Sequence, residues 1–133
     1  MKAIFADSFY FLALLRLDDL AHARALTASQ NRSERLITTA WILTEVADAL
    51  AVPGMREGFP RLLAALRADP ACMILPATQD LFDAGVELYA RRPDKAWSLT
   101  DCISFVVMQE HDIREALTGD RHFEQAGFIA LLR

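Results

Sequence analysis

Residues 117–128, "LTGDRHFEQAGF", contain the pattern that decides the fold. A short apolar run ends at Asp120, a helix-like segment occupies 121–127, and another apolar run occupies 128–132. This succession predicts a strand, an acid at its end, a short helix and a further strand. Asp120 has two interpretations: the N-cap of the short helix, or one corner of a site assembled from distant parts of the chain.

The same alternation runs through the rest of the chain. Short apolar or β-branched runs predict strands at 2–6, 35–39, 72–76, within 113–118, and at 128–132. Helical patterns lie between them at 8–19, 20–31, 40–52, 55–69, 78–92, 101–112 and 121–127, with Ser8 and Thr78 as candidate N-caps. Strands alternating with helices predict an α/β fold with a mainly parallel sheet. Ligands bind such sheets beyond the carboxyl ends of the strands.

Length and composition bound the class of protein. A chain of 133 residues that is 53% hydrophobic predicts a single domain over 1–133. The absence of a long uncharged apolar run predicts no membrane span, and "MKAIFADSFY" lacks the pattern of a signal peptide, so we expect a cytoplasmic protein. Cys72 and Cys102 have no metal-binding spacing and are expected to be buried thiols.

The net charge limits how the protein could meet a nucleic acid. A formal charge of −4 argues against a module that holds nucleic acid by charge alone. It does not exclude a nuclease, because acids that hold divalent cations present those cations to phosphates.

Two acids lie where the predicted sheet would expose them to a ligand. Asp7 follows the first strand, and it could form a turn or cap there. Glu45 lies inside an apolar helix face that includes Trp41, Ile42 and Ala49. A buried carboxylate requires a base, a shared proton or a cation, although Glu45 could also reach solvent at the edge of this face.

A third acid, Asp101, opens the most apolar helix. Its spacing from Ser98 matches a capping box, while Phe105 and Met108 lie on its side of the helix. In a parallel sheet, Asp7, Glu45, Asp101 and Asp120 can converge on one rim. There they would repel one another and raise one another's pKa unless divalent cations were bound. Oxygen ligands suit Mg²⁺ or Mn²⁺ better than Zn²⁺.

At these residues the chain resembles the PIN-domain family, in particular its VapC-type toxins. The resemblance covers essentially the whole chain and rests on "FADSFYFLALL", "TEVADAL", "LTDCISFVVMQEHDI" and "ALTGDRHFEQAGF". It implies a PIN-like three-layer α/β/α sandwich with about five strands. It also implies a Mg²⁺- or Mn²⁺-dependent endoribonuclease that hydrolyses single-stranded or structured RNA, a cognate antitoxin and a homodimer, for which the aromatic helix at 8–19 offers a surface.

The resemblance assigns a role to each candidate residue. The catalytic and metal-holding set is Asp7, Glu45, Asp101 and Asp120; the supporting set is Ser8, Thr118 and Ser104; possible RNA contacts are Arg91, Arg92 and Lys95. A backbone carbonyl could equally satisfy the Ser104 hydroxyl, and the basic cluster could be a solvated helix end. His122 adjoins the site and could approach the substrate, or simply lie on a helix surface.

Two other functions compete with the toxin nuclease. The chain could be an interaction protein that binds an antitoxin and has weak or vestigial nuclease activity. It could also be a metal-dependent phosphatase or a receiver-like domain, but the paired acids of such proteins near the first strand are missing because Ser8 and Phe9 follow Asp7.

Overall fold

The computed structural model describes residues 2–133, and a five-stranded sheet lies at its centre. The strands are β1 (Ala3–Ala6), β2 (Arg35–Thr39), β3 (Cys72–Leu75), β4 (Glu115–Leu117) and β5 (Ile129–Ala130). Their order is β3-β2-β1-β4-β5, and all four neighbouring pairs are parallel. The predicted α/β class and its sheet of five parallel strands are therefore confirmed.

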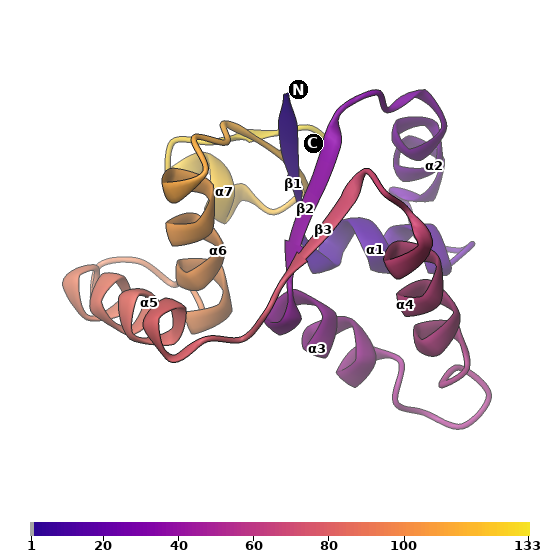
Figure 1. The fold of residues 1–133 in the computed structure, drawn as a ribbon, viewed down its shortest axis with the longest axis horizontal. Helices are drawn as coiled ribbons and strands as arrows, with labels where there is room; N and C mark the ends of the chain where they lie inside the picture. The colour runs from indigo at the N-terminus through magenta and orange to yellow at the C-terminus, as the bar shows by residue number, and fades with distance from the viewer. Residues whose placement is uncertain (1) are drawn as a thin grey trace.

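Seven helices surround the sheet in the described part of the chain. They are α1 (Ser8–Leu15), α2 (His22–Asn31), α3 (Ala40–Ala49), α4 (Gly58–Ala68), α5 (Gln79–Arg91), α6 (Leu99–Glu110) and α7 (Arg121–Gln125). Figure 1 shows α1, α2 and α4 on one side of the sheet and α5, α6 and α7 on the other. The α/β/α layering is confirmed. Among the described residues, no helix has the length and apolar character needed to cross a bilayer.

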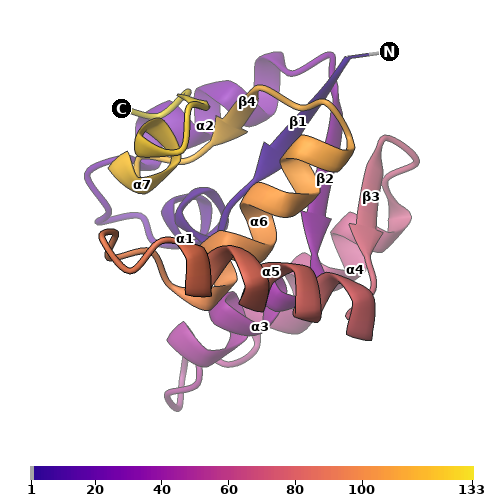
Figure 2. The same cartoon turned by 90° about the vertical axis from the view of Figure 1, so that its left-hand side faces the viewer.

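The core follows from the central position of β1 and the apolar composition of α6. Phe5 on β1 is fully buried, and α6 buries residues around most of its circumference. Phe105 of α6 packs edge to face against both Trp97 and Phe123, with ring centroids 5.0 Å apart in each pair. These aromatic contacts join α6 to α7, and Phe123 of α7 also packs against Phe5 of β1 with ring centroids 6.3 Å apart. Figure 2 shows α6 running across the sheet, with α5 beside it.

Several helix ends differ from the sequence-based expectations. The first helix ends at Leu15, because Arg16 leaves the helical conformation, and the third ends at Ala49. The predicted cap role of Ser8 is wrong: Ser8 is the first helical residue, and the chain enters the helix from Asp7 without a side-chain capping bond. The cap role of Thr78 is confirmed by a 3.2 Å hydrogen bond that the Leu81 N–H donates to its hydroxyl.

The strand order places a topological switch point between β1 and β4, and we call the sheet edge beyond the carboxyl ends of these two strands the β1–β4 crevice. From β1 the chain passes to β2 on one side, while β4 pairs with β1 on the other side. Connections therefore diverge beyond the carboxyl ends of β1 and β4, which is where open parallel sheets bind their ligands. Asp7 follows β1 at this point, and its N–H donates a 3.3 Å hydrogen bond to the Leu117 carbonyl at the end of β4.

The close packing of α5 on α6 depends on Gly85, which predicts a stability effect. A Cβ at Gly85 would overlap the Ile103 side chain and lie 3.3 Å from the Ile103 backbone nitrogen. We expect Gly85→Ala to lower the free energy of unfolding by about 1–3 kcal/mol, measured by urea denaturation. Gly58→Ala is the matched control, since its nearest contact would be 3.9 Å away. Equal effects of the two changes would contradict this account.

Candidate metal centre

A single buried hydroxyl links the two strand ends that flank the crevice. Thr118, directly after β4, is fully buried, and its hydroxyl donates a 2.7 Å hydrogen bond to Oδ2 of Asp7. The Thr118 hydroxyl oxygen also accepts a 3.0 Å hydrogen bond from the backbone N–H of Asp120. Asp7 is only 5% exposed. Thr118 therefore fixes both the Asp7 carboxylate and the backbone that carries Asp120.

Gly119 lies between these two anchored residues because the chain passes directly over an aromatic ring. A Cβ at this position would overlap the ring of Phe9 on α1. Glycine is required by this close approach rather than by an unusual backbone angle. The turn from β4 into α7 is thus pressed against the first turn of α1, which brings Asp120 toward the Asp7 side of the crevice.

Burial and mutual repulsion perturb the acids in this region. Burial raises the pKa of Asp7 to about 7; the Thr118 hydroxyl opposes this rise, and the charges of Asp101 and Glu45 add to it. Burial also raises the pKa of Glu45, a hydrogen bond from the Ser8 side chain opposes the shift, and the charges of Asp101 and Asp120 reinforce it. The four acids from four separate segments therefore act on one another electrostatically.

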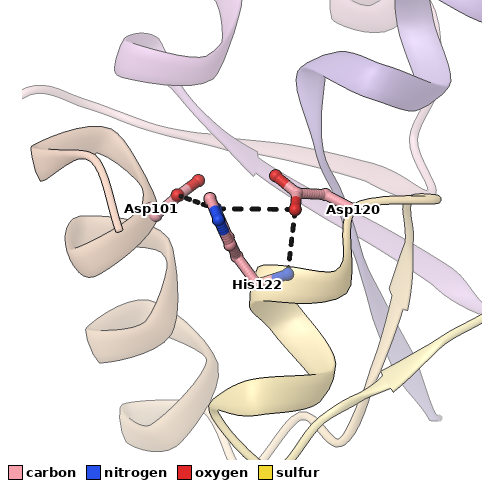
Figure 3. Close-up of side chains that lie close together, drawn as sticks. All are labelled: Asp101, Asp120 and His122. Atoms are coloured by element: carbon pink, nitrogen blue, oxygen red, sulfur yellow. Dashed lines mark hydrogen bonds and ion pairs between the residues drawn. The ribbon is translucent and has the colours of Figure 1, made fainter. Parts of the chain in front are cut away.

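Asp101, Asp120 and His122 form the tightest group (Figure 3). Nδ1 of His122 lies 3.0 Å from Oδ2 of Asp101 and 3.5 Å from Oδ1 of Asp120. One potential ligand atom from each residue falls within 4.8 Å of the others. Figure 3 shows the imidazole of α7 lying between a carboxylate from α6 and one from the turn before α7. Asp7 and Glu45 stand outside this trio.

The two carboxylates of the trio are also helix caps. Asp101 accepts a 3.1 Å hydrogen bond from the Ser98 N–H and completes a capping box with the Ser98 hydroxyl. Asp120 accepts a 2.8 Å hydrogen bond from the His122 N–H at the start of α7. Burial raises the pKa of Asp101, while the Ser98 N–H and His122 oppose the rise. The cap interpretation of these acids is therefore confirmed, and both carboxylates also approach His122, while their role in a functional site stays a prediction.

The other candidate residues lie in different surroundings. The Ser104 hydroxyl is buried without a hydrogen-bond partner, so the backbone-carbonyl alternative is wrong. Arg91 pairs with Glu87 at 3.8 Å on α5. Arg92 forms two 3.0 Å hydrogen bonds with Asp94 and lies over the ring of Trp97. Lys95 is half-buried in the same loop.

His122 contacts Asp101, although the predicted set of site residues does not include it. Its signal was its position two residues after Asp120, in the first turn of a helix whose N-cap is that acid. Sequence spacing alone does not give the direction of the imidazole. That direction depends on Phe123, which is fully buried against Phe5 and Phe105 and so orients α7.

The donor set fits a divalent cation. Burial raises the pKa of Asp7, Glu45 and Asp101, and the charges of neighbouring acids of the set add to each rise. No Lys or Arg side chain forms an ion pair with any of the four in the described chain, and only His122 offers a partial counter-charge. A hard cation with oxygen ligands would compensate this concentration of negative charge.

The Thr118 hydroxyl predicts a pH-dependent mutational effect. Thr118→Val keeps the shape but removes the bond that favours ionised Asp7, and it leaves the Asp120 N–H unpaired. We expect an unfolding free energy lower by about 1–3 kcal/mol, with a greater loss near pH 8 than near pH 5. Thr118→Ser keeps the hydroxyl and loses only a methyl group, so its smaller loss should not depend on pH. Denaturant titrations at both pH values test this, and parallel behaviour of the two variants would refute it.

The raised pKa of Asp7 predicts how metal-free stability varies with pH. Because folding favours the protonated carboxyl, its stabilising contribution is complete below the ordinary pKa of 3.8 and is lost as the pH rises through about 7. Asp7→Asn cannot titrate, so in EDTA its melting temperature should fall less than that of the wild type across this window. Asp18→Asn, at an exposed turn, should follow the wild type. Identical profiles for all three proteins would contradict the assignment.

Comparison with known proteins places this geometry in a family. The PIN domain model matches residues 4–129. The "23S rRNA-specific endonuclease VapC20" of Mycobacterium tuberculosis is 27% identical over 128 residues, which are 95% of each chain. The crystal structure of this VapC20, described as a sarcin-ricin loop cleaving toxin, superposes with a TM-score of 0.85 at 25% identity, covering 95% of this chain and 96% of that one.

A second solved structure shares the fold at lower identity. A chain of FitAcB from Neisseria gonorrhoeae has a TM-score of 0.67 and 18% identity, with 96% of this chain and 94% of that one covered. The family model, which spans nearly all of the sheet and the whole acidic rim, decides the assignment. The chain belongs to the PIN-domain family.

Proposed function

We propose that this chain is a Mg²⁺- or Mn²⁺-dependent endoribonuclease and the toxin of a toxin–antitoxin pair. The observation that carries the proposal is the meeting of Asp7, Thr118 and Asp120 at the β1–β4 crevice of a PIN fold. The VapC20 relative, whose name describes cleavage of 23S rRNA, aligns over 95% of the chain. RNA as the substrate would place the protein in the cytoplasm.

In this proposal the four acids bind the metal, and neighbouring hydroxyl groups position them. Asp7, Glu45, Asp101 and Asp120 hold the metal, whose charge would offset that of the phosphodiester and promote attack by water. Thr118 orients Asp7, and Ser8 supports the Glu45 carboxylate. Ser104 is the third supporting residue. Its buried, unpartnered hydroxyl one turn from Asp101 favours this role.

Contact of RNA with Arg91 or Arg92 would require these side chains to exchange their ion-pair partners. Arg91 and Arg92 are each paired with an acid. Arg92 also lies over the ring of Trp97. The indole Nε1–H of Trp97 donates a 3.0 Å hydrogen bond to the Gln125 side chain, at the end of α7. A phosphate would replace Asp94 as the partner of Arg92. Lys95 forms no ion pair in the described chain and would meet RNA without such an exchange.

A protein partner has two candidate surfaces. Tyr10 and Phe11 of α1 are buried, so the apolar surface near α1 comes instead from Leu17 and Leu20, 82% and 98% exposed. An apolar hollow of about 700 Å³ between α3, α4 and β3 is separate from the four acids. We assign the antitoxin contact and the homodimer contact to these two apolar surfaces.

The alternative is an antitoxin-binding protein with weak or vestigial nuclease activity. Exposed apolar residues are compatible with it, but an interaction module does not require four mutually repelling acids. Membership in the PIN family gives no support to the phosphatase or receiver-like alternative.

Cleavage of RNA tests the proposal directly. We expect the wild type to cleave a mixed RNA pool, which includes a sarcin–ricin loop oligonucleotide, with Mg²⁺ or Mn²⁺ and not in EDTA. Asp7→Asn and Asp101→Asn should each lower the cleavage rate by about 100-fold or more, because each removes a ligand charge. Asp18→Asn should retain the wild-type rate. Cleavage that survives both site changes would refute the active-site assignment, and an inactive wild type that still binds antitoxin would favour the alternative.

A further inference from the structure

We propose that His122 is a nitrogen ligand of the metal centre, beside Asp101 and Asp120, and that it makes the site prefer Mn²⁺ to Mg²⁺. This inference rests on the proposed function, because it concerns the same metal-dependent site. It adds a nitrogen donor to a set that the sequence predicts to be all oxygen.

The spacing of the donor atoms carries the inference. Ligands about 2.1 Å from an octahedral ion lie about 3.0 Å apart when they are adjacent. Nδ1 of His122 lies 3.0 Å from Asp101 Oδ2 and 3.5 Å from Asp120 Oδ1. The donor atoms of all three residues lie within 4.8 Å of one another, and the two separations that involve His122 are already close to that spacing. The 3.0 Å contact is also a good hydrogen bond, so a role as a donor that only orients Asp101 is the competing interpretation.

The backbone that carries the imidazole is held in place from two directions. The backbone N–H of His122 donates a hydrogen bond to Asp120, and the neighbouring Phe123 is fully buried against Phe5 and Phe105. Asp101 is fixed in turn by the Ser98 N–H. The side chains of His122, Asp101 and Asp120 are 24%, 14% and 34% exposed, so the group is partly shielded yet open to an ion. Such preorganisation is what a metal ligand requires.

The chemistry of the donors sets the metal preference. Mg²⁺ is bound by oxygen ligands and keeps much of its water, whereas imidazole suits transition metals. Mn²⁺ accepts both carboxylate oxygen and imidazole nitrogen. A site with His122 as a ligand should therefore gain affinity for Mn²⁺ with little gain for Mg²⁺.

Pulsed EPR on the Mn²⁺-loaded full chain detects the proposed bond directly. We expect electron spin echo modulation from a coordinated ¹⁴N nucleus in the wild type, changed to the ¹⁵N pattern when the histidines are labelled with ¹⁵N. His111→Asn removes an exposed imidazole at the end of α6 and should keep the modulation. His122→Asn should abolish it. Modulation that is absent from the wild type, or that persists in His122→Asn, would overturn the proposal.

Competitive binding of the two metals gives a second, independent measurement. His122→Asn should lower the Mn²⁺ affinity by about tenfold or more and change the Mg²⁺ affinity much less. An equal loss for both metals would indicate that His122 only orients Asp101 and would overturn the ligand role. RNA cleavage by the wild type with Mg²⁺ would leave the proposed function standing in that case, whereas failure of the wild type to bind either metal or cleave RNA would defeat both.

Discussion

The hydrogen bond from the Thr118 hydroxyl to Asp7 is the contact on which the site depends. It joins residues 111 positions apart, one at the end of the first strand and the other at the end of the fourth. The Thr118 hydroxyl oxygen also accepts a hydrogen bond from the backbone N–H of Asp120. The position of Asp120 is therefore coupled to the pairing of β1 with β4. A shift in the register of these strands would separate two of the acids, even if every helix remained in place.

The electrostatics of the rim impose a conflict between stability and function. The fold buries Asp7 and gathers other acids near it, which raises its pKa to about 7 and favours the protonated form. A metal ligand must be ionised. Binding of a cation would reverse this preference and release the proton that burial holds on Asp7, so metal binding should be weaker below about pH 7 than above it. The Thr118 hydroxyl opposes this rise in the pKa of Asp7 through its hydrogen bond to the carboxylate.

The sequence predicts most of this arrangement because local patterns determine much of it. Alternating apolar runs define the strands. The position of Glu45 in an apolar helix face indicates a carboxylate that requires a base, a shared proton or a cation. The capping spacing from Ser98 to Asp101 is found in the structure together with the approach of Asp101 to the other acids. The metal roles of the four acids remain predictions.

What the sequence does not predict depends on contacts between distant segments. The strand order, the Thr118–Asp7 bond and the direction of His122 arise from packing, including the burial of Phe123 among other aromatic rings. The limits of α1 and α3 were overestimated because their apolar patterns continue beyond the residues where the backbone leaves the helix. Ser8 was misplaced as a cap by one residue, since the preceding acid holds that position.

The strand order also affects when the crevice can form during synthesis. β1, β2 and β3 can pair once the chain has emerged as far as Leu75, but β4, the other neighbour of β1, is made near the end. Until β4 and Thr118 leave the ribosome, Asp7 lacks its hydroxyl donor and Asp120 is still missing from the growing rim. For an enzyme whose proposed substrate is RNA, this topology delays assembly of the site until the chain is nearly complete, so a prematurely terminated product would be inert.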